Sequence, residues 1–361
     1  MTNTFRNHPD LKPLLHKIQT SIEVNIIHRP LKFMEVCGTH TVSILKYGFR
    51  QYFKDSIKFL SGPGCPVCVT SAQDIDKIIF LAQQGHHIVT FGDLIKVPGS
   101  HSSLEKKIAK GATVDVVYSP LDALKIARNT NKEVIFIAVG FETTIPVIAS
   151  LVLDAYAQKL KNLSILCLVK TMPNVLRYLL SHLTGQIDGF ILPGHVSVII
   201  GSEPYEFIPE EYHIPCTIAG FESVDLGLGV ESLVEQIRSR SSKVDNRYIR
   251  MVKAEGNKAA QVLISSVFQE SDVSWRGFGM IPRSGLQLKE DFEQFDAAQK
   301  FDIQVDEVEL QTACICGDII SGKRSPLECT LFRNICTPEN PVGPCMVSFE
   351  GACAAYYKYG E

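Results

Sequence analysis

EVIFIAVGFETTIPVIASLVLDAYAQKL, residues 133–160, joins two patterns in one stretch. The opening run of apolar, mostly β-branched residues is typical of a strand buried on both faces. In the turn that follows, Thr143 or Thr144 is suited to cap a helix, and the apolar spacing after it is that of a helix. A strand, a short turn and a covering helix form half of a βαβ unit, so the stretch predicts a parallel sheet.

The same alternation extends over most of the chain. Seven further strand-like runs lie between residues 32 and 220, namely KFMEV, IKFL, HIVTF, TVDVVY, SILCLV, DGFILP and CTIAG. Eight strands exceed one small sheet, so we predict an α/β protein with two Rossmann-like parallel-sheet halves plus a smaller Cys-rich region. The expected units are a helical lead-in (1–31), two α/β domains (32–135 and 136–235), and a helical and Cys-rich domain (236–361).

Composition excludes several classes of protein. The chain has 361 residues, of which 45% are hydrophobic and 21% charged, an ordinary balance for a folded protein. A formal net charge of −3 gives no indication of the basic surface that nucleic-acid-binding proteins carry. The first residues lack the pattern of a signal peptide, and no apolar run is long enough to span a bilayer. We therefore expect a cytoplasmic protein without nucleic-acid or membrane partners.

Eleven cysteines are unusual for such a protein. In a reducing compartment they indicate metal binding or redox chemistry more than structural disulfides. Cys167 and Cys216 adjoin apolar runs and are expected to be small buried side chains. The others fall into two groups, a first group of Cys37, Cys65 and Cys68 and a tail group of Cys314, Cys316, Cys329, Cys336, Cys345 and Cys353.

Polar residues follow several of the predicted strands directly. Cys37 and His40 follow KFMEV, the pair Cys65 and Cys68 follows IKFL, Glu142 follows EVIFIAV, and His195 follows DGFILP. Ligands of open parallel sheets sit beyond the carboxyl ends of the strands. We therefore expect these six side chains at one rim, with Glu142 and His195 in the same cleft as Cys37, where they orient a ligand or transfer a proton.

Two interpretations of the first group stay open from spacing alone. Cys37, His40, Cys65 and Cys68 have the residue types and spacing of a structural zinc site. Against a closed zinc site, Ser71 is a suitable N-cap for a helix that starts just past Cys68, and the positive end of that helix would lower the pKa of a nearby thiol. A strand, a CxxC pair and a helix in that order are also typical of redox-active thiols.

The tail group is the strongest chemical signal. Four thiolates suffice for one [4Fe–4S] cluster and leave two cysteines over, whereas two structural zinc ions sharing ligands would use the same residues differently. The bacterial ferredoxin run is absent, so spacing does not identify the four ligands.

Taken together, the motifs resemble those of the HypD family, the iron–sulfur scaffold proteins of nickel–iron hydrogenase maturation. The resemblance covers essentially the whole chain. It rests on EVCGTHT (35–41), GPGCPVC (62–68), GFETT (140–144), LPGHVSVIIG (192–201) and PVGPCMVSFEGACAAYYKY (341–359). A departure from the family pattern is Phe349, where a small polar residue is more familiar.

The resemblance implies a specific division of labour among the cysteines. The family's tail pattern fits Cys314, Cys329, Cys336 and Cys353 as cluster ligands, with Cys316 and Cys345 spare, although Cys316 is an alternative to Cys314. Cys37 would ligate iron with support from His40. Cys65 and Cys68 would be a redox-active dithiol supplied with electrons by the cluster.

It also implies partners and a product. The protein would work with HypC and HypE to assemble an Fe(CN)2(CO) unit, which then passes to the large subunit of nickel–iron hydrogenase. It would thus be a metallocentre-assembly scaffold with redox activity rather than a conventional turnover enzyme. The alternatives are a zinc-stabilised binding module and a stand-alone thiol–disulfide oxidoreductase.

Overall fold

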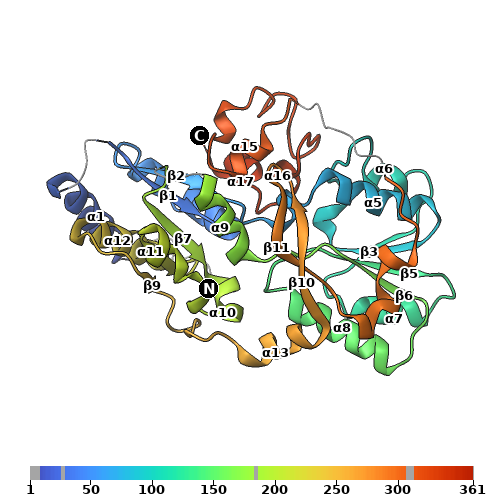
Figure 1. Ribbon diagram of the computed structural model, residues 1–361. Coiled ribbons are helices and arrows are strands. Elements are labelled where there is room, and N and C mark those ends of the chain that lie inside the picture. The colour runs from blue at the N-terminus through green and yellow to red at the C-terminus, as the bar shows by residue number, and fades with distance from the viewer. Residues whose placement is uncertain (1–8, 26–28, 183–185, 306–312, 361) are drawn as a thin grey trace.

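The structure is a computed structural model that describes residues 9–25, 29–182, 186–305 and 313–360. Two parallel sheets covered by helices lie side by side, and an antiparallel hairpin and the Cys-rich tail lie between them (Figure 1). The predicted class, two parallel α/β halves with a Cys-rich region, is confirmed. Of the predicted lead-in, α1 (Leu11–Asn25) is a helix, while residues 1–8 and 26–28 lie outside the described part.

The first sheet has five parallel strands in the order β2-β1-β7-β8-β9. Its core is apolar because alternate residues of the central strands face α1 and α12, as Phe33 and Phe59 do. The strands and the long helix are β2 (Ile57–Ser61), β1 (Leu31–Glu35), β7 (Gly189–Pro193), β8 (Cys216–Ala219), β9 (Val244–Asn246) and α12 (Ser223–Ser239).

The second sheet has four parallel strands in the order β4-β3-β5-β6. Every residue of its central strand β5 is buried, as the apolar run predicts. Helix α8 begins just after Thr144 and buries the face that carries Ile145, Ile148 and Val152. The elements are β4 (Val114–Val116), β3 (His87–Thr90), β5 (Val134–Ala138), β6 (Leu163–Cys167), α5 (Ala72–Gln83), α7 (Asp122–Arg128), α8 (Ile145–Ala157) and α9 (Met172–His182).

The sheets do not follow the predicted boundary between residues 135 and 136. After β2 the chain leaves the first sheet, builds all four strands of the second, and returns with β7 beside β1. Strands β3 and β4 therefore share a sheet with β6 of the other predicted unit, and they are joined to it through β5, which spans the predicted boundary. The expected ranges 32–135 and 136–235 are wrong as sheet units, because alternation identifies strands but not which strands pair.

The prediction that residues 236–361 are helical and Cys-rich misses a hairpin. Strands β10 (Phe268–Trp275) and β11 (Gly279–Leu288) pair antiparallel, with an irregularity near Ser271. Their sequences are polar and poorly alternating, which hid them. Isolated bridges from Trp275 to Thr70 and from Gly285 to Lys170 tie the hairpin to the loops of the second sheet.

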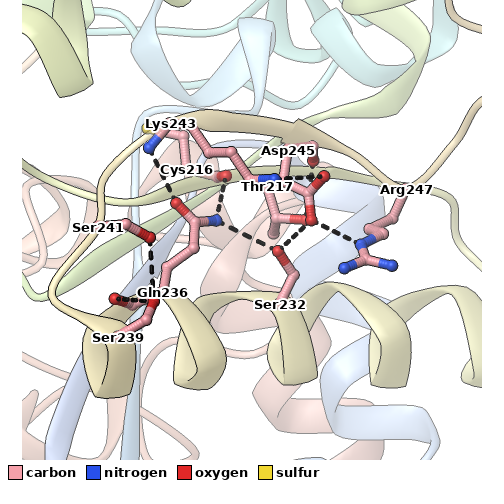
Figure 2. Close-up of polar contacts among 9 residues, drawn as sticks. All are labelled: Cys216, Thr217, Ser232, Gln236, Ser239, Ser241, Lys243, Asp245 and Arg247. Carbon is pink, nitrogen blue, oxygen red and sulfur yellow. Dashed lines mark hydrogen bonds and ion pairs between the residues drawn. The ribbon is translucent and has the colours of Figure 1, made fainter.

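Buried polar contacts fix α12 against the edge of the first sheet (Figure 2). The amide nitrogen Nε2 of Gln236 donates to the carbonyl of Cys216 at 3.2 Å, and Ser232 donates to Asp245 at 2.6 Å. Cys216 is fully buried, as expected. Cys167 is only half-buried, and its thiol donates to the carbonyl of Leu286 at 3.1 Å.

Short helices complete the described chain, and α16 and α17 of the tail pack on α4 and α2 of the first half. No helix in the described ranges is both long and apolar enough to cross a membrane. These remaining elements are α2 (Gly38–Lys46), α3 (Phe49–Tyr52), α4 (Pro66–Val69), η1 (Gly92–Leu94), α6 (Leu104–Ile108), α10 (Gly194–Ile200), η2 (Glu203–Tyr205), α11 (Phe207–Tyr212), α13 (Lys258–Val267), η3 (Glu290–Phe295), α14 (Ala297–Lys300), α15 (Cys316–Ile320), η4 (Pro326–Glu328), α16 (Pro344–Val347) and α17 (Ala352–Tyr359).

Candidate functional site

Cys37 stands between the end of β1 and the start of α2, where it is the N-cap residue. Two glycines let other backbone segments reach it. The amide of Gly38 donates to the carbonyl of Gly64 at 3.0 Å, and a Cβ added to Gly64 would lie 2.2 Å from the Cys37 nitrogen. A Cβ added to Gly38 would lie 2.5 Å from the carbonyl oxygen of Glu350. The CPVC loop and the tail thus both pack closely on the backbone of Cys37 and Gly38.

A cavity of about 140 Å³ opens beside this residue, and we call it the Cys37 cavity. Its walls come from loops of both sheets and from the tail, as the carboxyl ends of parallel strands permit. They are formed by Val36, Cys37, Thr39, Gly64, Pro66, Phe141, Thr143, Thr144, Pro193, His195, Val196 and Glu350. Of the six side chains predicted for one rim, Cys37 and His195 line this cavity.

The Cys37 thiol is poorly disposed to ionise by itself. Burial raises its pKa to about 12, and the neighbouring carboxylate of Glu350 acts in the same direction. The backbone amides of His40 and Thr39 oppose this shift because they face the sulfur. A positive ion next to the sulfur would reverse the balance, since metal binding takes the thiolate form.

The side chain of His40 does not line the Cys37 cavity. Its Nε2 lies 3.1 Å and 3.2 Å from the carbonyl oxygens of Gly220 and Ala219, so Nε2 carries the proton and donates. Burial lowers its pKa to about 4, which keeps the ring neutral at pH 7. The ring stacks on Phe221, which also contacts the ring of His195. Nδ1 is buried without a hydrogen-bond partner among the described groups.

Cys65 and Cys68 form a disulfide at the start of α4. The predicted Ser71 cap is present, since its hydroxyl accepts the amide of Asp74 at 3.0 Å and α5 follows. A disulfide sulfur is no zinc thiolate, so the four-residue zinc set with Cys37 and His40 is not assembled. Within the described ranges no three or more His, Cys, Asp or Glu side chains are arranged to hold a metal ion.

Glu142 and His195 were both expected in the same cleft as Cys37, and the structure places them in different pockets. His195 lies at the start of α10 and lines the Cys37 cavity, and burial lowers its pKa. Glu142 lies in the GFETT loop, but its side chain lines a different pocket. Its Oε1 accepts the amide of Met172 at 2.8 Å. The expectation that Glu142 faces the same cleft as Cys37 is therefore wrong, although its neighbours Thr143 and Thr144 do face it.

The tail cysteines surround a cavity of their own. Gly343 borders it, and a Cβ there would lie 2.5 Å from the Cys314 sulfur. The sulfurs of Cys316 and Cys345 lie 2.7 Å apart. Five cysteines line this cavity, namely Cys314, Cys329, Cys336, Cys345 and Cys353. All four cysteines of the family spacing are among them, and Cys316 is not.

Two carboxylates near Cys37 were missed from sequence. Glu350 accepts the hydroxyl of Thr39 at 2.7 Å, which joins the tail to α2. Glu35 is fully buried and accepts the hydroxyl of Thr41 at 2.6 Å, and burial raises its pKa to about 8. An acid at the end of an otherwise apolar strand was a readable signal for Glu35. Glu350 had none, because its position depends on how the tail folds back.

The fold and site define a class of protein, a two-sheet α/β protein in which a half-buried cysteine, a disulfide and a Cys-rich tail meet. The family profile HypD, described as "Hydrogenase formation hypA family", matches residues 11–360. The chain belongs to this family.

Curated relatives are similar over nearly their full length. The chain is 44% identical to hydrogenase maturation factor HypD of Cupriavidus necator, over 91% of this chain and 89% of that protein. It is 44% identical to hydrogenase maturation factor HypD of Escherichia coli, over 92% and 90%. It is 43% identical to hydrogenase expression/formation protein HupD of Azotobacter chroococcum, over 92% and 90%.

Proposed function

We propose that this protein acts in hydrogenase maturation, as the scaffold on which the Fe(CN)2(CO) unit of nickel–iron hydrogenase is assembled. The observation that carries the proposal is the Cys37 cavity. There one cysteine, the CPVC loop, His195 and a tail carboxylate come from four distant parts of the chain and meet. The names of the relatives place them in hydrogenase maturation or formation.

Iron under assembly is the substrate, and Cys37 is its proposed ligand on this chain. A thiolate suits a soft, low-valent iron with strong-field diatomic ligands. His40 supports the site through its Nε2, which donates to the two backbone carbonyls at the end of β8. A single protein ligand leaves iron open to a further thiolate, which we assign to the partner HypC. Separation of the two proteins then releases the finished unit toward the hydrogenase large subunit.

Cys65 and Cys68 are proposed to supply the electrons for cyanide transfer from HypE. Two thiolates and one carrier thiocyanate give one disulfide, one carrier thiolate and one cyanide ion. The new S–S bond forms as the S–C bond of the carrier breaks, and two electrons pass to the cyanide. The disulfide of the structure is the product state of this step, and Pro66 between the two cysteines lines the Cys37 cavity.

The tail is proposed to hold one [4Fe–4S] cluster on Cys314, Cys329, Cys336 and Cys353. The donor set fits such a group, because these four thiols border one small cavity, of about 10 Å³ as the side chains stand. Gly343 leaves beside Cys314 the room that a Cβ would fill. When bound, a cluster of this kind supplies electrons one at a time.

Cys316 and Cys345 lie on the path from the tail cavity to the disulfide. Their sulfurs are 2.7 Å apart, and the sulfur of Cys68 lies 4.0 Å from the carbonyl oxygen of Pro344, the residue before Cys345. Two electrons are needed to reopen the Cys65–Cys68 disulfide. Cys316 and Cys345, whose thiols are free, are suited to supply them by exchange, in which two thiolates become one disulfide as the Cys65–Cys68 bond breaks.

A stand-alone oxidoreductase is less well supported. Cys65 is 5% exposed and Cys68 is fully buried, so generic disulfide substrates do not reach them. Redox cysteines that serve many substrates are partially exposed. The burial instead favours a dithiol that serves one cavity, with cytoplasmic partners that dock over it.

Complementation tests the proposal. In a strain that lacks its own HypD-family protein, expression of this chain should restore nickel–iron hydrogenase activity, and Cys65→Ser should not. The anaerobically purified chain should contain iron and sulfide. Zinc without iron, together with no restored activity, would favour a zinc-stabilised binding module.

A further inference from the structure

A second pocket of about 560 Å³ lies on the other side of the GFETT loop from the Cys37 cavity, and we call it the Glu142 pocket. Phe141, Thr143 and Thr144 of that loop line the Cys37 cavity, whereas Glu142 lines this one. Its volume is in the range of small-molecule sites. The reaction proposed above makes no use of it.

About half of the residues that line this pocket are apolar, and the lining comes from elements of both halves and the hairpin. Apolar side chains combined with placed polar groups are the usual make-up of a small-ligand site. The apolar lining residues are Ile145, Pro173, Ile200, Pro204, Ile264 and Leu286.

The carboxyl group of Glu142 is the buried acid of this pocket, and one of its oxygens has no hydrogen-bond partner among the described groups. Glu142 is 4% exposed, and its Oε1 accepts the amide of Met172. Its Oε2 is buried without a hydrogen-bond partner among the described groups. Burial raises the pKa of Glu142 to about 7. A buried carboxyl oxygen left unpaired is costly, so a ligand that donates an N–H to Oε2 would be bound firmly.

Two arginines, each paired with a glutamate, stand at the more exposed part of the pocket, and one of these glutamates, Glu270, also lines it. Arg177 and Arg283 line the pocket, and their side chains are 45% and 73% exposed, far more than Glu142. Arg177 pairs with Glu211, and Arg283 pairs through Nε with Glu270 at 2.6 Å. These partners hold the two guanidinium groups in place. A guanidinium has five N–H donors, so each retains donors for an anion.

We propose that the Glu142 pocket binds a small aminocarboxylate, with its amino group on Glu142 and its carboxylate at Arg177 and Arg283. Glu142 supplies an unpaired carboxyl oxygen for the amino group, the two guanidinium groups supply further N–H donors for the carboxylate, and the apolar lining residues suit a short hydrocarbon chain. The ligand would rest against the loop whose other side forms the Cys37 cavity.

Binding of simple probes to the full chain tests this assignment. Saturation-transfer NMR and calorimetry at pH 8, where Glu142 is mostly ionised, would use glycine, β-alanine, 4-aminobutanoate and 6-aminohexanoate. Butylamine and butanoate, which each lack one charged end, are the matched controls. At least one member of the series should bind about tenfold or more tightly than both controls, because both ends are engaged.

Variants locate the binding. Glu142→Gln keeps an oxygen for the amide of Met172 but loses the negative charge, and it should weaken the best probe about 10- to 100-fold. Ile264→Trp fills the pocket from its apolar wall and should abolish binding independently of Glu142. Glu210→Gln, at an exposed glutamate outside the pocket, should bind as the parent does. Absence of binding across the whole series would overturn the proposal, as would undiminished binding by either pocket variant.

Discussion

The Cys37 cavity and the tail cavity are both built around cysteine, but different forces hold them in place. Around Cys37, two parallel sheets bring loop residues together, and the backbone at Gly38 and Gly64 packs in close contact. In the tail, the helices of residues 313–360 have eight residues or fewer, and five cysteines line the cavity. The fold therefore positions Cys37 without help, whereas we expect the tail to depend on what its cysteines bind.

The largest effect should follow from loss of a tail ligand. Cys336→Ser should remove nearly all cluster iron and sulfide and leave the tail open to proteolysis, because short helices alone cannot hold it. Iron and sulfide analysis with visible absorbance measures this. Cys167→Ser, which keeps a donor for the carbonyl of Leu286, is the matched control. A Cys336→Ser protein with full iron and sulfide would show that the tail does not bind a cluster this way.

The Cys65–Cys68 disulfide should open and close with the redox potential of the solution, and its cysteines should not bind zinc. Cys65 and Cys68 should interconvert together between disulfide and dithiol in an anaerobic redox titration followed by thiol trapping, because they share one S–S bond. Cys216, which is buried in the first sheet, serves as the unchanged reference thiol. Stoichiometric zinc that blocks trapping at every potential would favour the structural site instead.

A smaller effect is expected where backbone contact holds Cys37. Gly64→Ala would place a Cβ 2.2 Å from the Cys37 nitrogen, so the loop must shift. Overpacking of this kind should lower the free energy of unfolding by about 1–3 kcal/mol. Chemical denaturation measures it. Gly92→Ala, whose nearest contact would be 3.4 Å, should cost clearly less, and equal costs would mean that the close approach is not a constraint.

The effect that is smallest per pH unit is a change in pH dependence. The pKa of Glu142 is raised by burial from 4.5 to about 7, so between these values the unfolded chain releases a proton that the folded chain keeps. Stability of the parent should therefore fall with rising pH across this window, and Glu142 contributes at most about 1.4 kcal/mol per pH unit to that fall. Glu142→Gln should have a smaller slope than the parent and retain the part that comes from Glu35, whose pKa burial also raises, while Glu210→Gln should keep the full slope. Parallel curves for the parent and Glu142→Gln would contradict the shift.

Local pattern was enough to predict β1 to β8, the helix after GFETT and the Ser71 cap, because each depends on neighbours in the chain, but it missed β9 and the hairpin. The pairing of the strands was not predictable, since β7 pairs with β1 although all four strands of the second sheet lie between them in the sequence. For the same reason Glu350 was missed, and Glu142 was assigned to the wrong side of its own loop. Residues that follow strands share a rim, but the side chain of Glu142 points to the opposite side of its loop from those of Phe141 and Thr143.

Infrared spectroscopy of the complex with HypC tests the central claim, that Cys37 holds the iron under assembly. Cys37→Ala should leave the fold and the tail cluster intact, because backbone contacts rather than the sulfur build the cavity. The complex should nevertheless lose the stretching bands of iron-bound cyanide and CO, while Cys167→Ala should retain them. If Cys37→Ala complexes show those bands at the parent's intensity, Cys37 is not the assembly ligand.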